Sequence, residues 1–161
     1  MALTLIYTYY NQTEMLQRQL ENWASYPEEL KQQIRIMLVD DCSKTPVSAL
    51  VGEPDFHLEI YRVMEDMYCN IGGARNLGTK VCETEWMFHS DMDHILPPSE
   101  AEKVVALAEK NERKIYKFQR IDPESGKTKI HPGTMLLTRK VYWEVGGCDE
   151  DFVGNYGQTD I

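Results

Sequence analysis

Residues 86–95 read Trp-Met-Phe-His-Ser-Asp-Met-Asp-His-Ile, an apolar run that ends in two carboxylates. Asp91 and Asp93 stand two positions apart, so on an extended backbone their side chains leave the same face and point to one place. Such a pair can hold a divalent cation, Mg²⁺ or Mn²⁺, while substrate phosphates and water complete the metal's shell. The spacing alone carries little weight, because ten Asp residues in 161 produce about 0.6 such pairs by chance. Asp149 and Asp151 form a second pair, so the surrounding sequence has to decide between them.

Strands and helices alternate on both sides of this stretch. Besides the strand in the quoted stretch, strands are expected at residues 3–8, 34–39, 57–63, 114–121, 127–130 and 133–138. Helices are expected before Pro27, briefly after it, and at 139–145. A glycine-bearing loop at residues 70–78 is expected to lead into a helix that runs to about Cys82, and a capping box that starts at Ser99 is expected to open another helix. This order predicts an α/β fold with a Rossmann-like, mostly parallel central sheet, helices on both of its faces and antiparallel strands added late.

Length and charge limit the possible classes of protein. A chain of 161 residues fits a single domain with one core. The net charge of −9 argues against a nucleic-acid-binding surface and against a basic face for membranes. An anionic substrate would therefore need a local counterion, either a metal or a placed arginine.

The cysteines and the apolar runs suggest a cell compartment. The four cysteines show no Cys-x-x-Cys pair and no zinc-site spacing. The sequence shows no secretory signal and no apolar run of transmembrane length. Because reduced thiols are typical of intracellular proteins, we expect a cytoplasmic protein without a transmembrane segment.

Polar side chains follow three of the expected strands. Residues 8–11, Asp40 with Asp41, and Asp91 with Asp93 each stand where a buried strand ends. In open α/β sheets, ligands bind outside the carboxyl ends of the strands, so the three groups are expected to converge on one site. The second Asp-x-Asp pair follows a Gly-Gly turn instead, which makes the first pair the preferred metal site.

The glycine-bearing segment 70–78 does not match a known phosphate-binding loop. Gly73 and Gly78 are followed by Thr-Lys, the reverse of the order in a P-loop, and the spacing misses Gly-x-Gly-x-x-Gly. Gly78 lies inside the expected helix, where glycine costs about 1 kcal/mol against alanine, and this indicates a close approach of the helix to the sheet. Arg75 is either a surface residue or, on the first turn of a helix near the site, a ligand for a diphosphate.

Several candidate side chains also have purely structural interpretations. Asp40 and Asp41 can cap the turn after their strand, the commoner role for Asp there, or bond to a base or ribose. The tyrosines of the first strand can be plain strand formers, or a ring at the strand end can stack on a nucleobase. His94 and His131 are lone histidines in the sequence, for which a structural or solvated role is commoner than a ligand role.

Five blocks of the sequence carry a family likeness. The blocks are residues 6–11, 38–43, 70–78, 91–93 and 146–150. Their order resembles the inverting GT-A glycosyltransferases of family 2, and the likeness spans nearly the whole chain. The resemblance implies a GT-A fold, a nucleotide-sugar donor that is most often UDP-linked, and Mn²⁺ or Mg²⁺ as the cofactor.

The resemblance also implies roles on the donor side. Thr8, Tyr9 and Asp41 match the family's uridine-binding positions, with Asp40 at the edge of the same pocket. Arg75 falls on the arginine of the family's Ala-Arg-Asn block, near the diphosphate.

The remaining roles concern the metal, the reaction and the acceptor. Asp91 would approach the ribose and the metal, and Asp93 would coordinate the metal directly. Asp160 matches the aspartate that serves as the catalytic base, although Gln-Thr replaces the residues usual before it. Three residues would lie toward the acceptor: His131, Asp149 and Glu150.

The resemblance implies one glycosyltransferase domain over residues 1–161, with a nucleotide-binding part at about 1–95 and an acceptor part at about 96–161. Family members usually continue beyond the position of Asp160, so we expect a chain truncated at its C-terminal end. The implied activity is metal-dependent transfer of a sugar, with inversion, to a saccharide, glycoprotein or lipid-linked acceptor. Two alternatives are a nucleotidyltransferase, which would carry a glycine-rich basic loop after the first strand, and a sugar-nucleotide-binding module without turnover.

Overall fold

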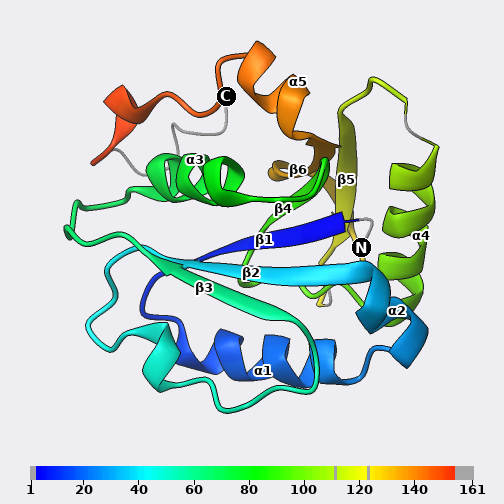
Figure 1. Ribbon diagram of the computed structural model, residues 1–161, viewed down its shortest axis with the longest axis horizontal. Coiled ribbons are helices and arrows are strands. Elements are labelled where there is room, and N and C mark those ends of the chain that lie inside the picture. The colour runs from blue at the N-terminus through cyan, green and yellow to red at the C-terminus, as the bar shows by residue number, and fades with distance from the viewer. Residues whose placement is uncertain (1–2, 111, 123, 155–161) are drawn as a thin grey trace.

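The sheet at the centre of the molecule has six strands in the order β3-β2-β1-β4-β6-β5 (Figure 1). The computed structural model describes residues 3–110, 112–122 and 124–154. The strands are β1 (Leu3–Tyr9), β2 (Ile34–Asp40), β3 (Leu58–Arg62), β4 (Trp86–Asp91), β5 (Tyr116–Ile121) and β6 (Thr128–Thr138). The helices are α1 (Thr13–Ala24), α2 (Glu28–Gln33), η1 (Val47–Ala49), α3 (Ile71–Val81), α4 (Pro98–Glu109), α5 (Arg139–Glu144) and η2 (Glu150–Phe152).

The parallel part of the sheet is built around β1. It pairs in parallel with β2 and β4, and β2 pairs in parallel with β3, while β6 and β5 are antiparallel additions. Tyr9 lies opposite Asp40, and Thr8 lies opposite Asp91, so three strands finish at the same edge. The predicted fold class, including the late antiparallel strands, is confirmed.

Helices cover both faces of the sheet, as Figure 1 shows. Alternate side chains of β1 point to opposite faces. Leu5 packs with Trp23 in the apolar cluster under α1, α2 and α4, whereas Ile6 packs with Ala74 in the cluster under α3 and α5. Among the described residues, no helix combines the length and the apolar character needed to cross a membrane.

Two helix starts differ from the expectation. The first turn of α3 contains Gly72 and Gly73, so the glycines belong to the helix and not to a preceding loop. The helix α4 starts at Pro98 with Pro97 at its N-cap and no side-chain cap, so the capping box expected from Ser99 does not form. Proline suits a first helical position because an N–H there would have no intrahelical partner.

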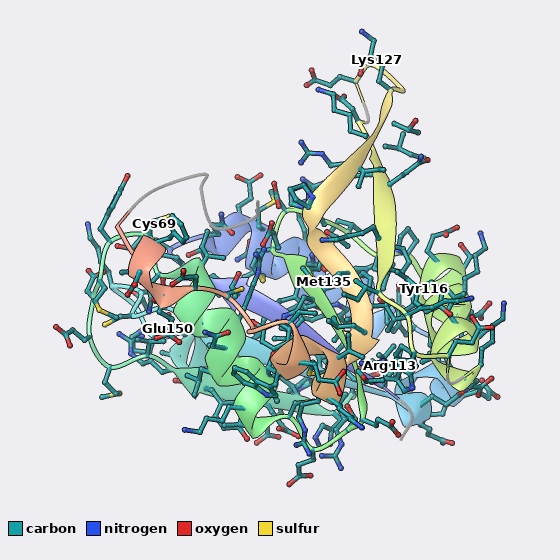
Figure 2. The ribbon with its side chains drawn as sticks, turned by 90° about the horizontal axis from the view of Figure 1, so that it is seen from above. Cys69, Arg113, Tyr116, Lys127, Met135 and Glu150 are labelled. Atoms are coloured by element: carbon teal, nitrogen blue, oxygen red, sulfur yellow. The ribbon has the colours of Figure 1, made fainter. Side chains whose placement is uncertain are left out.

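The strand β6 is one element of 11 residues where two short strands were expected. Its ladder with β5 is interrupted, because Lys117 pairs with Met135 but Gln119 pairs with Ile130. Residues 131–134 therefore stand opposite a single residue of β5 and bulge out of the ladder. Beyond this bulge the hairpin projects from the body of the molecule, with Lys127 near its tip (Figure 2).

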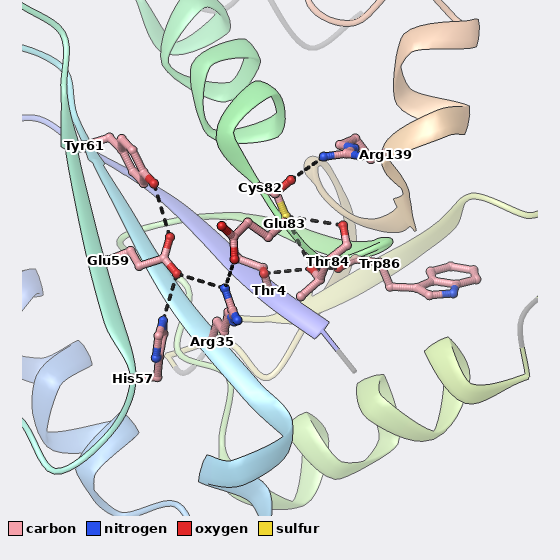
Figure 3. A network of polar contacts seen from close by, with 10 residues as sticks. All are labelled: Thr4, Arg35, His57, Glu59, Tyr61, Cys82, Glu83, Thr84, Trp86 and Arg139. Carbon is pink, nitrogen blue, oxygen red and sulfur yellow. Dashed lines mark hydrogen bonds and ion pairs between the residues drawn. The ribbon is translucent and has the colours of Figure 1, made fainter. Parts of the chain in front are cut away.

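A polar network joins the parallel strands at the edge where they begin (Figure 3). The hydroxyls of Thr4 and Thr84 lie 2.8 Å apart, and Arg35 bridges Glu59 and Glu83 at N–O distances of 3.3 and 2.6 Å. Ion pairs at a surface contribute roughly 0–1 kcal/mol each. Because ligands of such sheets bind at the opposite edge, we assign this network to the alignment of the strand starts.

The helix α3 approaches the sheet closely at Gly78. A Cβ atom there would lie 2.7 Å from Ile6 Cγ2 and 3.1 Å from Val39 Cγ2. Both neighbours are fully buried, so neither can move aside without repacking the core. The close approach predicted from a glycine inside the helix is therefore confirmed.

The substitution Gly78→Ala tests this packing. In an open helical position, alanine stabilises by about 1 kcal/mol relative to glycine, whereas overpacking a core costs about 1–3 kcal/mol. We expect the steric cost to win, and the free energy of unfolding in urea to fall by about 1 kcal/mol. The control is Gly52→Ala. A Cβ atom at this position would have no neighbouring atom within 4 Å, so the substitution should change the free energy of unfolding by less than about 0.5 kcal/mol. A more stable Gly78→Ala protein would contradict the close approach.

Candidate functional site

The turns after β1 and β2 hold each other in place. Asn11 has a φ of 53°, a left-handed conformation that asparagine tolerates. Its N–H donates to Ser43 Oγ at 2.9 Å, and its side-chain oxygen accepts from the N–H of Lys44 at 2.9 Å. The N–H of Asp41 donates to the carbonyl of Tyr9 at 2.9 Å. The two strand ends therefore form one fixed polar rim.

Asp40 is buried, with 1 % exposure, and its carboxylate belongs to the turn after β2. Its Oδ1 accepts from the N–H of Ser43 at 2.8 Å, and its Oδ2 accepts from the N–H of Val47 at 3.1 Å. Arg62 forms an ion pair with the same Oδ2. This geometry favours the turn-capping interpretation of Asp40 over a contact with a base or ribose.

Asp41 is also buried, with 5 % exposure, but its carboxylate is only partly used. Its Oδ2 accepts from the N–H of Asn70 at 3.2 Å. Its Oδ1 is buried and accepts no hydrogen bond from the residues that the structure describes. Burial raises the pKa of Asp41, and hydrogen bonding by Asn70 opposes that rise. A buried acceptor without a donor costs about 1–3 kcal/mol, so this oxygen is suited to an N–H of a ligand.

The residues at the end of β1 present different groups to the rim. Thr8 is half-buried and lies opposite Asp91 in the ladder. The ring of Tyr9 is 1 % exposed and packs in the cluster on the α1 face, so its backbone, and not its ring, faces the rim. Tyr10 is 43 % exposed, and its hydroxyl donates to Asp66 at 3.4 Å. An aromatic side chain for stacking is thus offered by Tyr10.

Arg75 and Asp91 form an ion pair between α3 and the end of β4. Arg75 Nη2 donates to Asp91 Oδ1 at 2.9 Å, and the two side chains are 2 % and 27 % exposed. Gly133 makes room for this pair, because a Cβ atom there would lie 2.3 Å from Arg75 Nη2. A buried guanidinium requires a charged partner. Arg75 is therefore a buried residue of the carboxyl edge and not a surface residue.

The Asp-x-Asp pair sits on a turn. The strand β4 ends at Asp91, and the N–H of His94 donates to the carbonyl of Asp91 at 3.1 Å. The extended backbone assumed for this pair is therefore wrong. The side chain of Asp93 is 56 % exposed, with its Oδ1 3.7 Å from His94 Nε2. Asp93 thus lies beside the neighbouring histidine at the rim.

This turn is fastened to α1 by Gln19, a residue that the sequence patterns did not single out. Its Nε2 donates to the carbonyls of Met92 at 2.9 Å and of His94 at 2.8 Å, and the residue is fully buried. Gln19 lies on the same helical face as Leu16 and Trp23. A polar residue in an apolar helical stripe is the signal that could have revealed it.

The bulge of β6 brings two more side chains to Asp91. His131 Nε2 lies 3.8 Å from Asp91 Oδ2, and the rings of His131 and His94 meet edge-on with centroids 4.1 Å apart. Thr134 Oγ1 lies 3.1 Å from His94 Nδ1 and 3.4 Å from His131 Nδ1. A proline and a glycine inside the bulge are typical of such an interruption. The two histidines, far apart in the sequence, therefore belong to one cluster.

Asp91, His94 and His131 could hold a cation. One ligand atom from each residue lies within 4.8 Å of the other two. Carboxylates and imidazoles both bind divalent ions, and the two nitrogen donors favour an ion such as Mn²⁺ over Mg²⁺, which prefers oxygen. The donor set therefore fits a divalent metal.

Two of the other predicted site residues, Asp149 and Glu150, lie beside α3. Asp149 caps the short helix η2, and Glu150 Oε1 accepts from Asn76 Nδ2 at 2.7 Å. Among the described residues, no hydrogen bond or ion pair joins Asp149 or Glu150 to Asp91. Asp160, the predicted base, lies outside the described residues.

The sequence of residues 4–155 matches the model of one protein family, described as Glycosyl transferase family 2. The chain belongs to glycosyl transferase family 2. This assignment agrees with the six-stranded sheet and with the position of Asp41 and Asp91 at its carboxyl edge. A search of curated proteins finds no significant match.

Solved structures share the fold of this family 2 chain at low sequence identity. S. aureus TarS 1–349 superposes with a TM-score of 0.78 at 15 % identity, over 96 % of this chain and 52 % of that chain. Mannosyltransferase PcManGT from Pyrobaculum calidifontis, solved with GDP-Man and Mn²⁺, gives 0.72 at 17 % identity, over 99 % and 49 %. GalNAc-T7, solved with UDP, GalNAc and Mn²⁺, gives 0.71 at 13 % identity, over 99 % and 39 %. The chain thus spans about half the length of these structures or less.

His89 lies in β4 beneath this site and is fully buried. Its Nε2 is 3.0 Å from Thr79 Oγ1, and its ring stacks on Tyr142 with centroids 5.3 Å apart. Burial, reinforced by the charge of Arg75, lowers the pKa of His89 from 6.5 to about 3. The folded protein therefore holds this imidazole neutral.

This burial predicts a specific pH dependence of stability. Because the pKa of His89 is lower in the folded state, the unfolded state binds the proton more readily below pH 6.5. Between pH 6.5 and 5 the free energy of unfolding should fall by up to about 1.4 kcal/mol per pH unit from this residue. Urea denaturation of the wild type and of His89→Gln at several pH values isolates the effect, since the variant lacks it. Parallel pH curves for the two proteins would show that His89 does not titrate in this way.

Proposed function

We propose that this chain is the donor-binding and catalytic part of a metal-dependent glycosyltransferase, which transfers a sugar from a nucleoside diphosphate to an acceptor hydroxyl with inversion. The observation that carries the proposal is the buried Asp41 oxygen without a donor, at the rim where parallel strands end. Family membership supports it. Solved structures of the same fold are named as complexes with UDP-GlcNAc, with GDP-Man, and with UDP and GalNAc.

The base of the donor would bind against β2. Asp41 Oδ1 can accept a ring N–H, which both uracil and guanine offer, and we expect a UDP-linked donor from the family likeness. The exposed ring of Tyr10 can stack on the base at the same rim. Thr8 is half-buried and stands at the rim between Asp41 and Asp91. Its side chain would face the ribose.

The diphosphate would bind between α3 and β4. Asn70 is the N-cap of α3 and donates its backbone N–H to Asp41, so the N-terminus of this helix opens on the rim. Helix N-termini favour anions, and Arg75 adds a full charge at the same edge. Both groups would stabilise the negative charge that develops on the leaving diphosphate.

The metal would be held by Asp91 with His94 and His131, and Asp93 stands beside them. A bound divalent ion would supply further stabilisation of the leaving diphosphate. Asp91 keeps its Oδ1 on Arg75 in the described structure, which leaves Oδ2 on the side of His131. The carboxylate can therefore orient Arg75 with one oxygen and bind the ion with the other.

The acceptor would be bound by the part at about 96–161, and the donor by the part at about 1–95. We propose Asp160 as the base that removes the proton from the acceptor hydroxyl. Asp149 and Glu150, which α3 holds in place through Asn76, are proposed to face the acceptor. The acceptor class is a saccharide, a glycoprotein or a lipid-linked sugar.

A donor titration tests the proposed activity. The protein is titrated with UDP-sugars and GDP-sugars in the presence of Mn²⁺, and nucleotide release is then measured with candidate acceptors. Transfer with release of the nucleoside diphosphate is the expected result. Binding without release from any acceptor would instead indicate a donor-binding module, and no Mn²⁺-dependent binding of any nucleotide sugar would overturn the proposal.

The substitution Asp41→Asn tests the assignment of the base pocket. Replacing one carboxylate oxygen by an N–H₂ group removes an acceptor for the ring N–H, and a hydrogen bond to a charged group contributes about 1.5–3 kcal/mol. Calorimetric titration with UDP and Mn²⁺ should therefore show an affinity about 10- to 100-fold weaker. Asp66→Asn is the matched control, because it removes the same charge near Tyr10 at the rim, and it should change the affinity by less than about threefold. Equal losses of UDP affinity in the two variants would show that the nucleobase does not bind at Asp41.

A further inference from the structure

A line of side chains runs from the projecting hairpin to Asp91. Arg120 Nη1 lies 3.2 Å from His94 Nε2, and His94 Nδ1 lies 3.1 Å from Thr134 Oγ1. Thr134 Oγ1 lies 3.4 Å from His131 Nδ1. The line ends where His131 Nε2 lies 3.8 Å from Asp91 Oδ2. It therefore connects β5 to the proposed metal site through both histidines.

The guanidinium at one end of this line determines where His94 carries its proton. A guanidinium can only donate, so His94 Nε2 accepts from Arg120 and the neutral His94 carries its proton on Nδ1. His94 Nδ1–H then donates to Thr134 Oγ1. Both ring nitrogens of His94 are therefore engaged, Nε2 by Arg120 and Nδ1 by Thr134.

While Arg120 is in place, His94 offers no free nitrogen to a metal ion. An imidazole must offer an unprotonated ring nitrogen to bind a cation. Arg120 uses the lone pair of His94 Nε2, and His94 Nδ1 carries the proton that it donates to Thr134. A guanidinium 3.2 Å from a ligand nitrogen would also repel a divalent ion bound there.

We propose that Arg120 competes with the metal ion, so that binding of the ion releases Arg120 and frees the β5–β6 hairpin from the site. The inference rests on the metal site proposed above. Arg120 would act through His94, so it is a positioning residue. Release is structurally easy, because Arg120 is exposed and the hairpin projects from the body as a two-stranded ribbon (Figure 2). Metal loading would thus be coupled to the position of the hairpin next to the proposed metal site.

The substitution Arg120→Ala should tighten metal binding. Removing the competitor is expected to strengthen Mn²⁺ affinity at least about fivefold, the lower end of typical coupling between sites. Free Mn²⁺ is measured by electron paramagnetic resonance without nucleotide. Lys129→Ala is the matched control, because Lys129 lies opposite Arg120 in the ladder and its loss removes the same charge from the same hairpin. The Mn²⁺ affinity of Lys129→Ala should stay within about twofold of the wild type. The Mn²⁺ affinity of Arg120→Lys should lie between those of the wild type and Arg120→Ala.

Coupling must act in both directions, which supplies a second measurement. Adding Mn²⁺ to the wild type should speed amide hydrogen exchange at residues 119–122 and 124–130, because the hairpin loses its contact with His94. The same addition should leave exchange of these residues unchanged in Arg120→Ala. A purely structural role for Arg120 predicts weaker Mn²⁺ binding in Arg120→Ala, not stronger.

The outcomes separate this inference from the proposed function. Mn²⁺ binding that is lost in Asp91→Asn but is equal in the wild type, Arg120→Ala and Lys129→Ala would overturn the competition and leave the metal site standing. Equal tightening in Arg120→Ala and Lys129→Ala would also overturn it, because hairpin charge alone would then be responsible. No Mn²⁺ binding by the wild type or by Arg120→Ala would overturn the competition together with the metal site.

Discussion

The carboxyl edge of this sheet depends on a guanidinium that has almost no contact with water. Arg75 is 2 % exposed, and such burial is tolerable only with a carboxylate close by, which Asp91 provides at 2.9 Å. The pair fixes α3 against the end of β4, and β6 can pass over it because Gly133 has no side chain. One ion pair thus sets the relative positions of three elements and leaves a second oxygen of Asp91 directed toward His131.

The two aspartates that follow β2 show how adjacent residues of one type divide structural and functional work. Asp40 spends its carboxylate on two backbone N–H groups and on Arg62, and so builds the turn. Asp41 receives one backbone N–H from the start of α3 and retains a buried oxygen without a donor. The first side chain therefore holds the rim in shape, and the second is the one that we propose accepts a hydrogen bond from the nucleobase.

Part of this arrangement could be predicted from the sequence. Alternating strands and helices predict a parallel sheet, and parallel strands must end at a common edge, so the position of Asp41 and Asp91 at one edge follows from local patterns. The pairing of His94 with His131 does not, because it depends on a bulge created by the long-range register of β6 with β5. The turn at Asp93 was missed for a similar reason: Gln19, distant in sequence, holds it through backbone carbonyls. Periodicity describes how an element faces the core, and it does not report which distant side chains fasten its end.

We propose above all that the carboxyl edge of β1, β2 and β4 binds a nucleoside diphosphate together with a divalent metal. A crystal structure of the protein with UDP and Mn²⁺, recorded at a wavelength where manganese scatters anomalously, tests this claim most directly. We expect an anomalous peak in coordination contact with Asp91 and at least one of the two histidines, and a uracil ring whose N–H faces Asp41 Oδ1. A manganese peak at Asp149 and Asp151, or a nucleotide bound away from the carboxyl edge, would contradict it.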